Sequence, residues 1–176
     1  RSGWSKQGGF EIYLMDGTMG TKLWNIVREA GQPFDIGPGS PGTPERTESG
    51  LLSVGGDSDH TTNPFEVRLG KYVDLKVSDD VIGIDALRRV SKDGPQRHQL
   101  GLILDGESPA PLKFSWEDIY FKGKKVGDMT NCVWSYKLHA NIGYALISVD
   151  LKPGDEVDIS SQERSAKAKL VELPFL

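Results

Sequence analysis

The stretch His98-Gln99-Leu100-Gly101-Leu102-Ile103-Leu104 opens the part of the chain that decides the fold. It is a short apolar run with branched side chains, which is typical of a β-strand. Further strand-like runs, separated by turn residues, follow at 118–121, 125–127, 129–134, 142–150, 156–159 and 166–173. Six or seven short strands with regular turn signals predict a small antiparallel β-barrel or a sandwich.

Three lysines, Lys122, Lys124 and Lys125, stand between two of these strands and next to Gly123. We interpret them as the solvated tip of a β-hairpin rather than as a nucleic-acid-binding patch. The formal net charge of −4 supports this interpretation, because general nucleic-acid binders present a basic surface.

The part of the chain before the barrel mixes extended and helical patterns. Apolar periodicity predicts strands at 10–15 and 71–75 and helices at 18–30, 45–52 and 84–90. Gly31 is placed to end the first of these helices, and Pro44 stands near the first turn of the second. We therefore predict an α+β protein with one domain at residues 1–90 and a β-barrel domain at residues 91–176.

The loop at 37–44 contains six Gly or Pro residues among its eight positions. Such a loop can be a flexible linker or a rigid, ligand-facing segment, since Pro fixes φ and Gly permits close backbone approach. We favour the second interpretation because periodic sequence resumes immediately after it.

Composition places the chain among folded proteins. Hydrophobic residues make up 37% and charged residues 26% of its 176 positions. Cys132 is the single cysteine, so no internal disulfide can form, and a buried thiol in a reducing compartment is expected. No apolar stretch is long enough to span a bilayer, and no signal peptide is evident. We predict a cytoplasmic protein that binds neither membrane nor nucleic acid.

Metal-binding and catalytic patterns are weak in this sequence. The histidines His60, His98 and His139 are scattered, without metal-ligand spacing. The pair Asp57 and Asp59 lacks the twelve-residue spacing of a calcium loop. No phosphate-binding glycine loop or nucleophile elbow is present either. We therefore predict no metal site, and the residues alone identify no catalytic group.

Four motifs in a fixed order carry a family resemblance, and they read GWSKQGGFEI at 3–12, ERTESGLL at 45–52, NPFEVRLG at 63–70 and VIGIDAL at 81–87. They resemble, in the same order, motifs of the glycine cleavage system aminomethyltransferase family. The stretches 123–130, 135–145, 152–157 and 173–175 resemble that family's C-terminal barrel. The resemblance spans nearly the whole chain. It implies the C-terminal part of a folate-binding core, followed by the small antiparallel β-barrel.

The resemblance also implies tetrahydrofolate as the cofactor, held by Glu11 and Arg46. A carboxylate can accept paired hydrogen bonds from the aminopyrimidine edge of a pterin, and a guanidinium offers a charged fork. Trp4 takes the place of a family tyrosine and could form an aromatic wall of the site. The structural alternatives are a solvent-facing carboxylate for Glu11, an exposed ion pair with Glu48 or Glu45 for Arg46, and a core aromatic for Trp4.

Two departures from the aminomethyltransferase pattern, at 4–9 and 39–46, are closer to the dimethylsulfoniopropionate demethylase branch. That branch moves a methyl group from a small sulfonium donor to tetrahydrofolate, which needs positioning more than an acid or base. Folate-dependent aryl-ether demethylases share many of these features. The alternatives are a glycine cleavage aminomethyltransferase and a non-catalytic folate-binding C-terminal module of a flavin-dependent amine dehydrogenase. The cysteine motif of relatives that assemble iron–sulfur clusters is missing at 78–84.

The first residues, 1–9, contain no methionine and lead at once into the first strand-like run. We expect the chain to begin in the middle of a larger protein, whose missing N-terminal portion is its partner. The family's essential N-terminal aspartate has no counterpart here. This polypeptide alone is therefore expected to be inactive, although it belongs to a transferase.

Overall fold

The computed structural model describes residues 8–40, 42–78, 80–106, 116–160 and 165–176. The chain separates into two compact units, Arg1–Gly42 and Thr43–Leu176.

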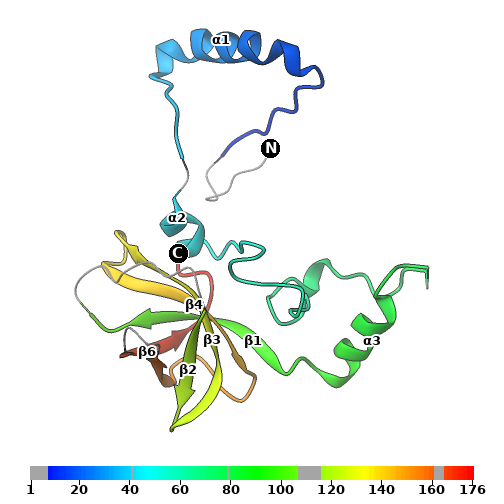
Figure 1. Cartoon of the computed structure of the whole chain (residues 1–176), viewed down its shortest axis with the longest axis vertical. Helices are drawn as coiled ribbons and strands as arrows, with labels where there is room; N and C mark the ends of the chain where they lie inside the picture. Colours follow the sequence, from blue (N-terminus) through cyan, green and yellow to red (C-terminus); the bar gives the residue numbers. More distant parts are fainter. Residues whose placement is uncertain (1–7, 41, 79, 107–115, 161–164) are drawn as a thin grey trace. The chain divides into compact units, whose positions relative to one another are not determined.

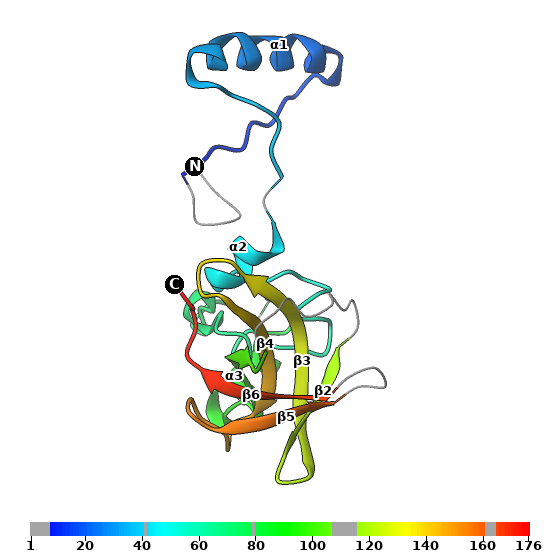
Figure 2. The same ribbon diagram turned by 90° about the vertical axis from the view of Figure 1, so that its left-hand side faces the viewer.

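The second unit is built on a closed antiparallel barrel (Figures 1 and 2). Its strands are β1 Arg97–Leu104, β2 Glu117–Phe121, β3 Lys124–Ser135, β4 Ala140–Ser148, β5 Glu156–Ser160 and β6 Ser165–Val171. Their order around the barrel is β1-β4-β3-β2-β5-β6, and the pairing of β6 with β1 closes the ring. This confirms the α+β class with a C-terminal antiparallel barrel.

The barrel core is formed by inward side chains contributed by all six strands. Leu102, Ile119, Ile147, Ile159 and Leu170 are fully shielded from solvent. Strand β4 is buried at every position from Asn141 to Ile147, so both of its faces are covered. Its apolar composition follows from this, because only a strand that faces solvent needs alternate polar residues.

The barrel has six strands rather than seven, because two of the predicted runs form a single continuous strand. The runs at 125–127 and 129–134 join in β3, whose pairing with β4 shifts register between Met129 and Asn131. Such a bulge interrupts the alternation of inward and outward side chains, and so a continuous strand resembles two short ones. Cys132 lies on this strand and is buried, as predicted.

The lysine-rich hairpin tip is confirmed. Lys122 and Gly123 connect β2 to β3 and both have positive φ, at 51° and 78°. The charge of Lys125 is matched locally, because its Nζ lies 2.7 Å from Asp118 Oδ1 and 2.9 Å from Asp128 Oδ1. These two carboxylates raise the pKa of Lys125.

Two helices precede the barrel within the second unit, α2 Thr43–Glu48 and α3 Ile84–Asp93. Helix α2 ends earlier than the predicted 45–52, because Gly50 takes φ 73° and Leu51 N–H donates to Arg46 C=O at 2.9 Å. That pair of features is a Schellman ending. Helix α3 begins where predicted and leads into β1 through Gly94.

The strand predicted at 71–75 is wrong. The chain forms a 3-10 helix at Gly70–Tyr72 instead, and turn bonds join Tyr72 N–H to Leu69 C=O and Val73 N–H to Gly70 C=O. Gly70 also lies so close to the Phe65 ring that an added Cβ would stand 2.8 Å from it. This tight turn leaves no extended edge for a neighbouring strand.

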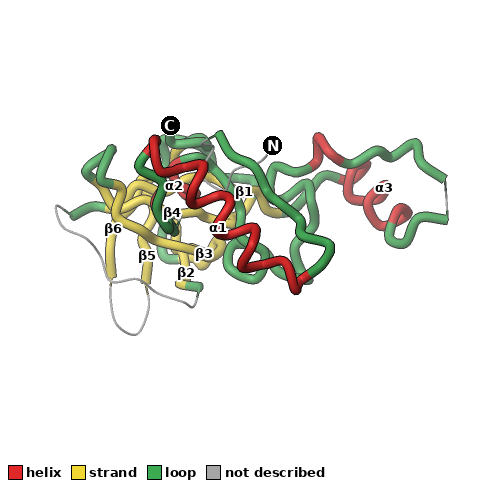
Figure 3. Tube along the Cα trace, turned by 90° about the horizontal axis from the view of Figure 1, so that it is seen from above, coloured by secondary structure: helices red, strands yellow, loops and turns green. Residues whose placement is uncertain are grey.

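The first unit contains α1 Gly20–Gly31, which confirms the helix predicted at 18–30 and its end at Gly31 (Figure 3). Short 3-10 helices, Gly17–Met19 and Gln32–Phe34, flank it. The strand predicted at 10–15 is not formed among the described residues. A strand needs a hydrogen-bonded neighbour, and the described part of the chain supplies none there.

The division into domains at 1–90 and 91–176 stays a prediction, although β1 begins at Arg97.

None of the helices in the described ranges combines the length and the apolarity that crossing a bilayer requires.

Candidate functional site

Arg46 projects from α2 into a buried polar cluster between that helix and the barrel. Its Nη1 lies 2.6 Å from Asp57 Oδ2, and the side chains of Arg46 and Asp57 are 8% and 0% exposed. The same nitrogen donates to Leu51 C=O at 3.1 Å. The guanidinium thus links the helix to the turn that follows it.

The Asp57 carboxylate has further donors, which offset the cost of burying its charge. Ser53 N–H donates to Oδ2 at 2.8 Å, and Asn131 Nδ2 on β3 donates to Oδ1 at 2.9 Å. Thr130 Oγ1 lies 3.4 Å from the same oxygen. Burying a carboxylate without such partners costs several kcal/mol, so this set of donors is what permits a fully buried Asp57.

Tyr144 on β4 fastens the other side of α2 to the barrel. Its hydroxyl lies within 3.0–3.2 Å of the carbonyl oxygens of Arg46 and Thr47, in the last turn of α2, and of Leu51, which follows the helix. Burial of the phenol is the main cause that raises the pKa of Tyr144, and the nearby negative charge of Asp57 raises it further. The phenol therefore stays protonated and can donate to these carbonyls throughout the neutral pH range.

The C-terminal residues pack on the same helix. The backbone N–H groups of Phe175 and Leu176 both donate to Glu48 C=O at 3.1 Å, and the Phe175 ring stacks on Tyr144 with centroids 6.4 Å apart. The Glu48 carboxylate accepts from Ser135 Oγ at 2.7 Å and lies 3.2 Å from Lys137 Nζ. These contacts hold the C-terminal end of α2.

The partner of Arg46 was not predicted from the sequence. The structural alternative named Glu48 or Glu45, yet the ion pair is formed with Asp57, eleven residues along the chain in a turn-rich loop. Glu48 bonds to Ser135 and Lys137 instead. No local spacing rule connects a helix residue to such a loop, and so only the three-dimensional structure shows the pair.

Glu11 lies in the first unit, on an extended and exposed segment. The hydroxyl of Tyr13 donates to Glu11 Oε2 at 2.7 Å. Residues two apart on an extended chain point to the same side, and so this carboxylate and this phenol form one polar face. Hydrogen bonding to Glu11 and the charge of that carboxylate raise the pKa of Tyr13.

The pKa of Tyr13 offers a test of this pair. In Glu11→Gln, the carboxylate that disfavours the phenolate is gone, and the pKa of Tyr13 is expected to fall towards the ordinary value of about 10. A pH titration of ¹³C-labelled tyrosine by NMR measures it. Tyr120 is the control, because Asp118 raises its pKa in the same way and is unaffected by the substitution. Unchanged titration of every tyrosine would show that the pair is absent.

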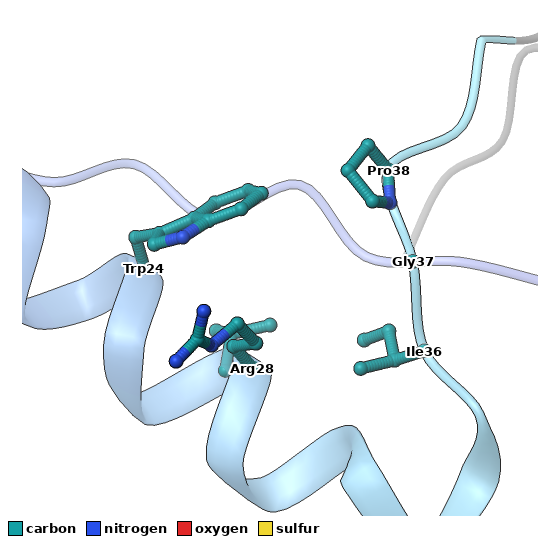
Figure 4. Close-up of a pocket in the computed structure, with 6 residues that line it drawn as sticks. Trp24, Arg28, Ile36, Gly37 and Pro38 are labelled. Atoms are coloured by element: carbon teal, nitrogen blue, oxygen red, sulfur yellow. The ribbon is translucent and has the colours of Figure 1, made fainter.

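A pocket of about 210 Å³ lies within the first unit, between α1 and the segment that follows it. It is lined by Trp24, Val27, Arg28, Ile36, Gly37 and Pro38. Figure 4 shows the Trp24 indole extending over the gap on the helix side, with Ile36 and Pro38 opposite. The lining is mainly apolar, with the Arg28 guanidinium as its charged group.

The predicted site residues lie in different units of the chain or outside the described residues. The structure brings Glu11 together with Tyr13 in the first unit, and Arg46 together with Asp57 in the second. Trp4 lies outside the described residues. The roles of all three towards tetrahydrofolate stay predictions. Within the described part of the chain, no cluster of three or more His, Cys, Asp or Glu side chains is arranged to hold a metal ion.

Two family comparisons cover most of the chain. Residues 1–77 match the GCVT N-terminal domain, and residues 97–176 match the glycine cleavage T-protein C-terminal barrel domain. The second match spans the whole barrel, from β1 to the C-terminal residues that pack on α2.

Individual relatives agree with the family matches. The dimethylsulfoniopropionate demethylase of Ruegeria pomeroyi is 38% identical over 147 residues, which are 84% of this chain and 39% of that protein. The aminomethyltransferase of Pseudothermotoga lettingae is 32% identical over 180 residues, which are 99% of this chain and 47% of that protein. The chain thus spans less than half the length of these relatives.

A solved structure shares the fold. The glycine cleavage system aminomethyltransferase T of Bartonella henselae superposes with a TM-score of 0.66 at 21% sequence identity. The superposition covers 76% of this chain and 37% of that one.

Proposed function

The chain belongs to the glycine cleavage T-protein family, and from this membership we propose that it takes part in a tetrahydrofolate-dependent one-carbon transfer. The proposed reaction moves a methyl group from a small donor such as dimethylsulfoniopropionate to tetrahydrofolate. The family resemblance inferred from the four ordered motifs is confirmed by these matches.

The choice of methyl donor rests on a difference in sequence identity between two groups of relatives. The chain is 38% identical to the dimethylsulfoniopropionate demethylase and 30–33% identical to seven aminomethyltransferases. A glycine cleavage aminomethyltransferase is the second candidate, because those seven matches cover 99% of this chain against 84% for the demethylase.

The carboxylate of Glu11, on the polar face that it shares with Tyr13, is the kind of acceptor that a pterin requires. A pterin presents an N–H and an exocyclic amine side by side, and a carboxylate accepts from both at once. The Tyr13 hydroxyl, 2.7 Å from Glu11 Oε2, fixes the carboxylate in place. We therefore propose that Glu11 holds the pterin and that Tyr13 orients Glu11.

Arg46 is proposed as a second cofactor contact, under a constraint that the structure sets. Its guanidinium already bonds to Asp57 and to Leu51 C=O, and only 8% of the side chain is exposed. A contact with tetrahydrofolate would therefore have to come from guanidinium N–H groups other than those that donate to Asp57 and Leu51. The proposed aromatic wall at Trp4 depends on the sequence motif alone.

Tetrahydrofolate, when bound, supplies the nitrogen that accepts the one-carbon unit. In the proposed demethylation the methyl carbon would bond to that nitrogen, whose proton is released, while the carbon–sulfur bond of the sulfonium breaks with its electron pair on sulfur and a neutral thioether leaves. Because a sulfonium is an intrinsically good leaving group, the residues have to orient the reactants and exclude water rather than donate a proton. The exposed Glu11 and Tyr13 pair is suited to orientation.

The small methyl donor is the proposed substrate partner, and a cytoplasmic location is proposed from the single buried cysteine. The activity of the whole protein is likewise a proposal, since the chain covers 39–47% of its relatives.

A methyl-transfer assay tests the proposed function. The part of the Ruegeria pomeroyi demethylase that this chain does not match is joined to residues 1–176 as one polypeptide. With dimethylsulfoniopropionate and tetrahydrofolate, we expect a methylated folate and a thioether, both measured by mass spectrometry. Transfer only from an aminomethyl donor would favour the second candidate. A folded fusion that transfers from neither donor would contradict both.

A further inference from the structure

The C-terminal segment, residues 173–176, covers the C-terminal end of α2. Glu48 C=O accepts hydrogen bonds from the backbone N–H groups of both Phe175 and Leu176, each at 3.1 Å. The last carbonyls of a helix have no partner within the helix, so their bonds have to come from elsewhere. A helix of six residues is too short to be stable by itself, and α2 therefore depends on such outside contacts.

The barrel provides a seat for the Phe175 ring. The ring stacks on Tyr144, with the two centroids 6.4 Å apart. A Cβ added to Gly101 on β1 would stand 2.9 Å from two atoms of the same ring, so the absence of a side chain at this position makes room for it. The Tyr144 hydroxyl in turn bonds to the carbonyl oxygens of Arg46 and Thr47 in α2. Phe175 thus supports the residue that holds these helix carbonyls.

Arg68 fastens the same segment from the solvent side. Its Nη2 donates to Leu173 C=O at 2.6 Å. A Cβ added to Gly50, which follows α2, would stand 3.3 Å from Pro174 Cβ and 3.5 Å from Arg68 Nη1, so both residues lie against the turn that ends the helix. Arg68 and Leu176 are themselves exposed, and water can therefore reach the segment at either end.

We propose that residues 173–176 act as a latch, which detaches by local opening while the barrel stays folded and leaves the C-terminal end of α2 mobile. Segments with few buried contacts open at a lower free energy than the core. When the latch opens, Glu48 C=O loses both of these backbone donors, and Tyr144 loses the ring that stacks on it. The barrel core is retained, because its fully buried side chains, such as Leu102 and Ile159, lie on the strands. This motion needs neither folate nor a methyl donor, so it goes beyond the proposed function.

Native-state hydrogen exchange of the whole chain tests the latch, with and without Phe175→Ala. The amides of residues 49–51 report on α2, because they donate to the carbonyls of residues 45–47. In the variant we expect them to exchange at least about tenfold faster than in the unsubstituted chain. The amide of Ile159 reports on the barrel, since this buried residue of β5 is paired with both β2 and β6. Its exchange rate is expected to be unchanged.

Two further variants make the result specific. Leu176→Ala is the matched control, because this side chain is 53% exposed and the substitution keeps the backbone N–H that bonds to Glu48, so no rate is expected to change. Arg68→Met removes the bond to Leu173 C=O without altering the Phe175 ring, and it is expected to accelerate residues 49–51 in the same way.

Unchanged exchange at residues 49–51 in either Phe175→Ala or Arg68→Met would overturn the proposal. Equal acceleration at Ile159, or loss of the folded state in these variants, would also overturn it, because residues 173–176 would then belong to the barrel core.

Discussion

Replacing Arg46 by methionine is expected to lower the free energy of unfolding of the barrel unit by about 3–5 kcal/mol. The substitution keeps most of the aliphatic volume but removes the charge that neutralises Asp57, which has no exposed surface. The hydrogen bonds from Ser53 and Asn131 are retained, yet they do not replace a full positive charge at 2.6 Å. Urea unfolding followed by circular dichroism gives the change.

An exposed ion pair of the same barrel provides the control. Lys125→Met removes two contacts, to Asp118 and Asp128, but the lysine side chain is 49% exposed and water can replace them. We expect a loss below about 1 kcal/mol. Equal losses for the two variants would show that burial does not determine the strength of the Arg46–Asp57 pair.

Gly143→Ala is expected to destabilise the barrel by about 3 kcal/mol or more. A Cβ at Gly143 on β4 would collide with the backbone carbonyl oxygen of Asn131 on β3, at the point where the pairing shifts register. A backbone oxygen cannot rotate away, so the two strands would have to separate. The clash also lies beside Asn131, which donates to Asp57, so the damage extends to the polar cluster.

Gly56→Ala is the matched control for this variant. The nearest atom to an added Cβ there is Ser53 Cβ at 3.4 Å, which is an ordinary contact. We expect a change within about 1 kcal/mol, measured by the same urea titration. A comparable loss at both glycines would mean that the close approach of β3 and β4 is not what restricts position 143.

The barrel could be predicted from the sequence because its determinants are local. Short apolar runs, glycines at turns and the Lys-Gly tip each specify a strand or its end, and the Gly31 and Gly94 endings do the same for helices. The bulge in β3 was missed because it interrupts alternation within one strand. Alternation alone cannot distinguish a bulge from a strand end.

The site was harder to predict because its contacts are distant in sequence. Asn131 bonds to Asp57 across 74 positions, and Tyr144 bonds to Thr47 across 97. The strand predicted at 10–15 carries the right alternation but has no neighbour among the described residues. A strand depends on its partner, and sequence pattern reports only one side of that pair.

These observations separate two kinds of polar group. Arg46, Asp57 and Tyr144 are buried and fix α2 to the barrel, so their first measurable effect is on stability. Glu11 and Tyr13 are exposed and join no described core, so a change there should leave stability nearly unaltered. Ligand binding can therefore be tested at Glu11 without unfolding the protein.

The most direct test of the central claim is the affinity of the single-chain fusion for tetrahydrofolate, measured by titration calorimetry with and without Glu11→Gln. Loss of a paired, charge-assisted contact predicts an affinity that falls at least about tenfold, with the unfolding free energy unchanged. Gln keeps the size of the side chain, so a fall would report the charge. Equal affinity of the two proteins would contradict the assignment of Glu11 to the tetrahydrofolate site.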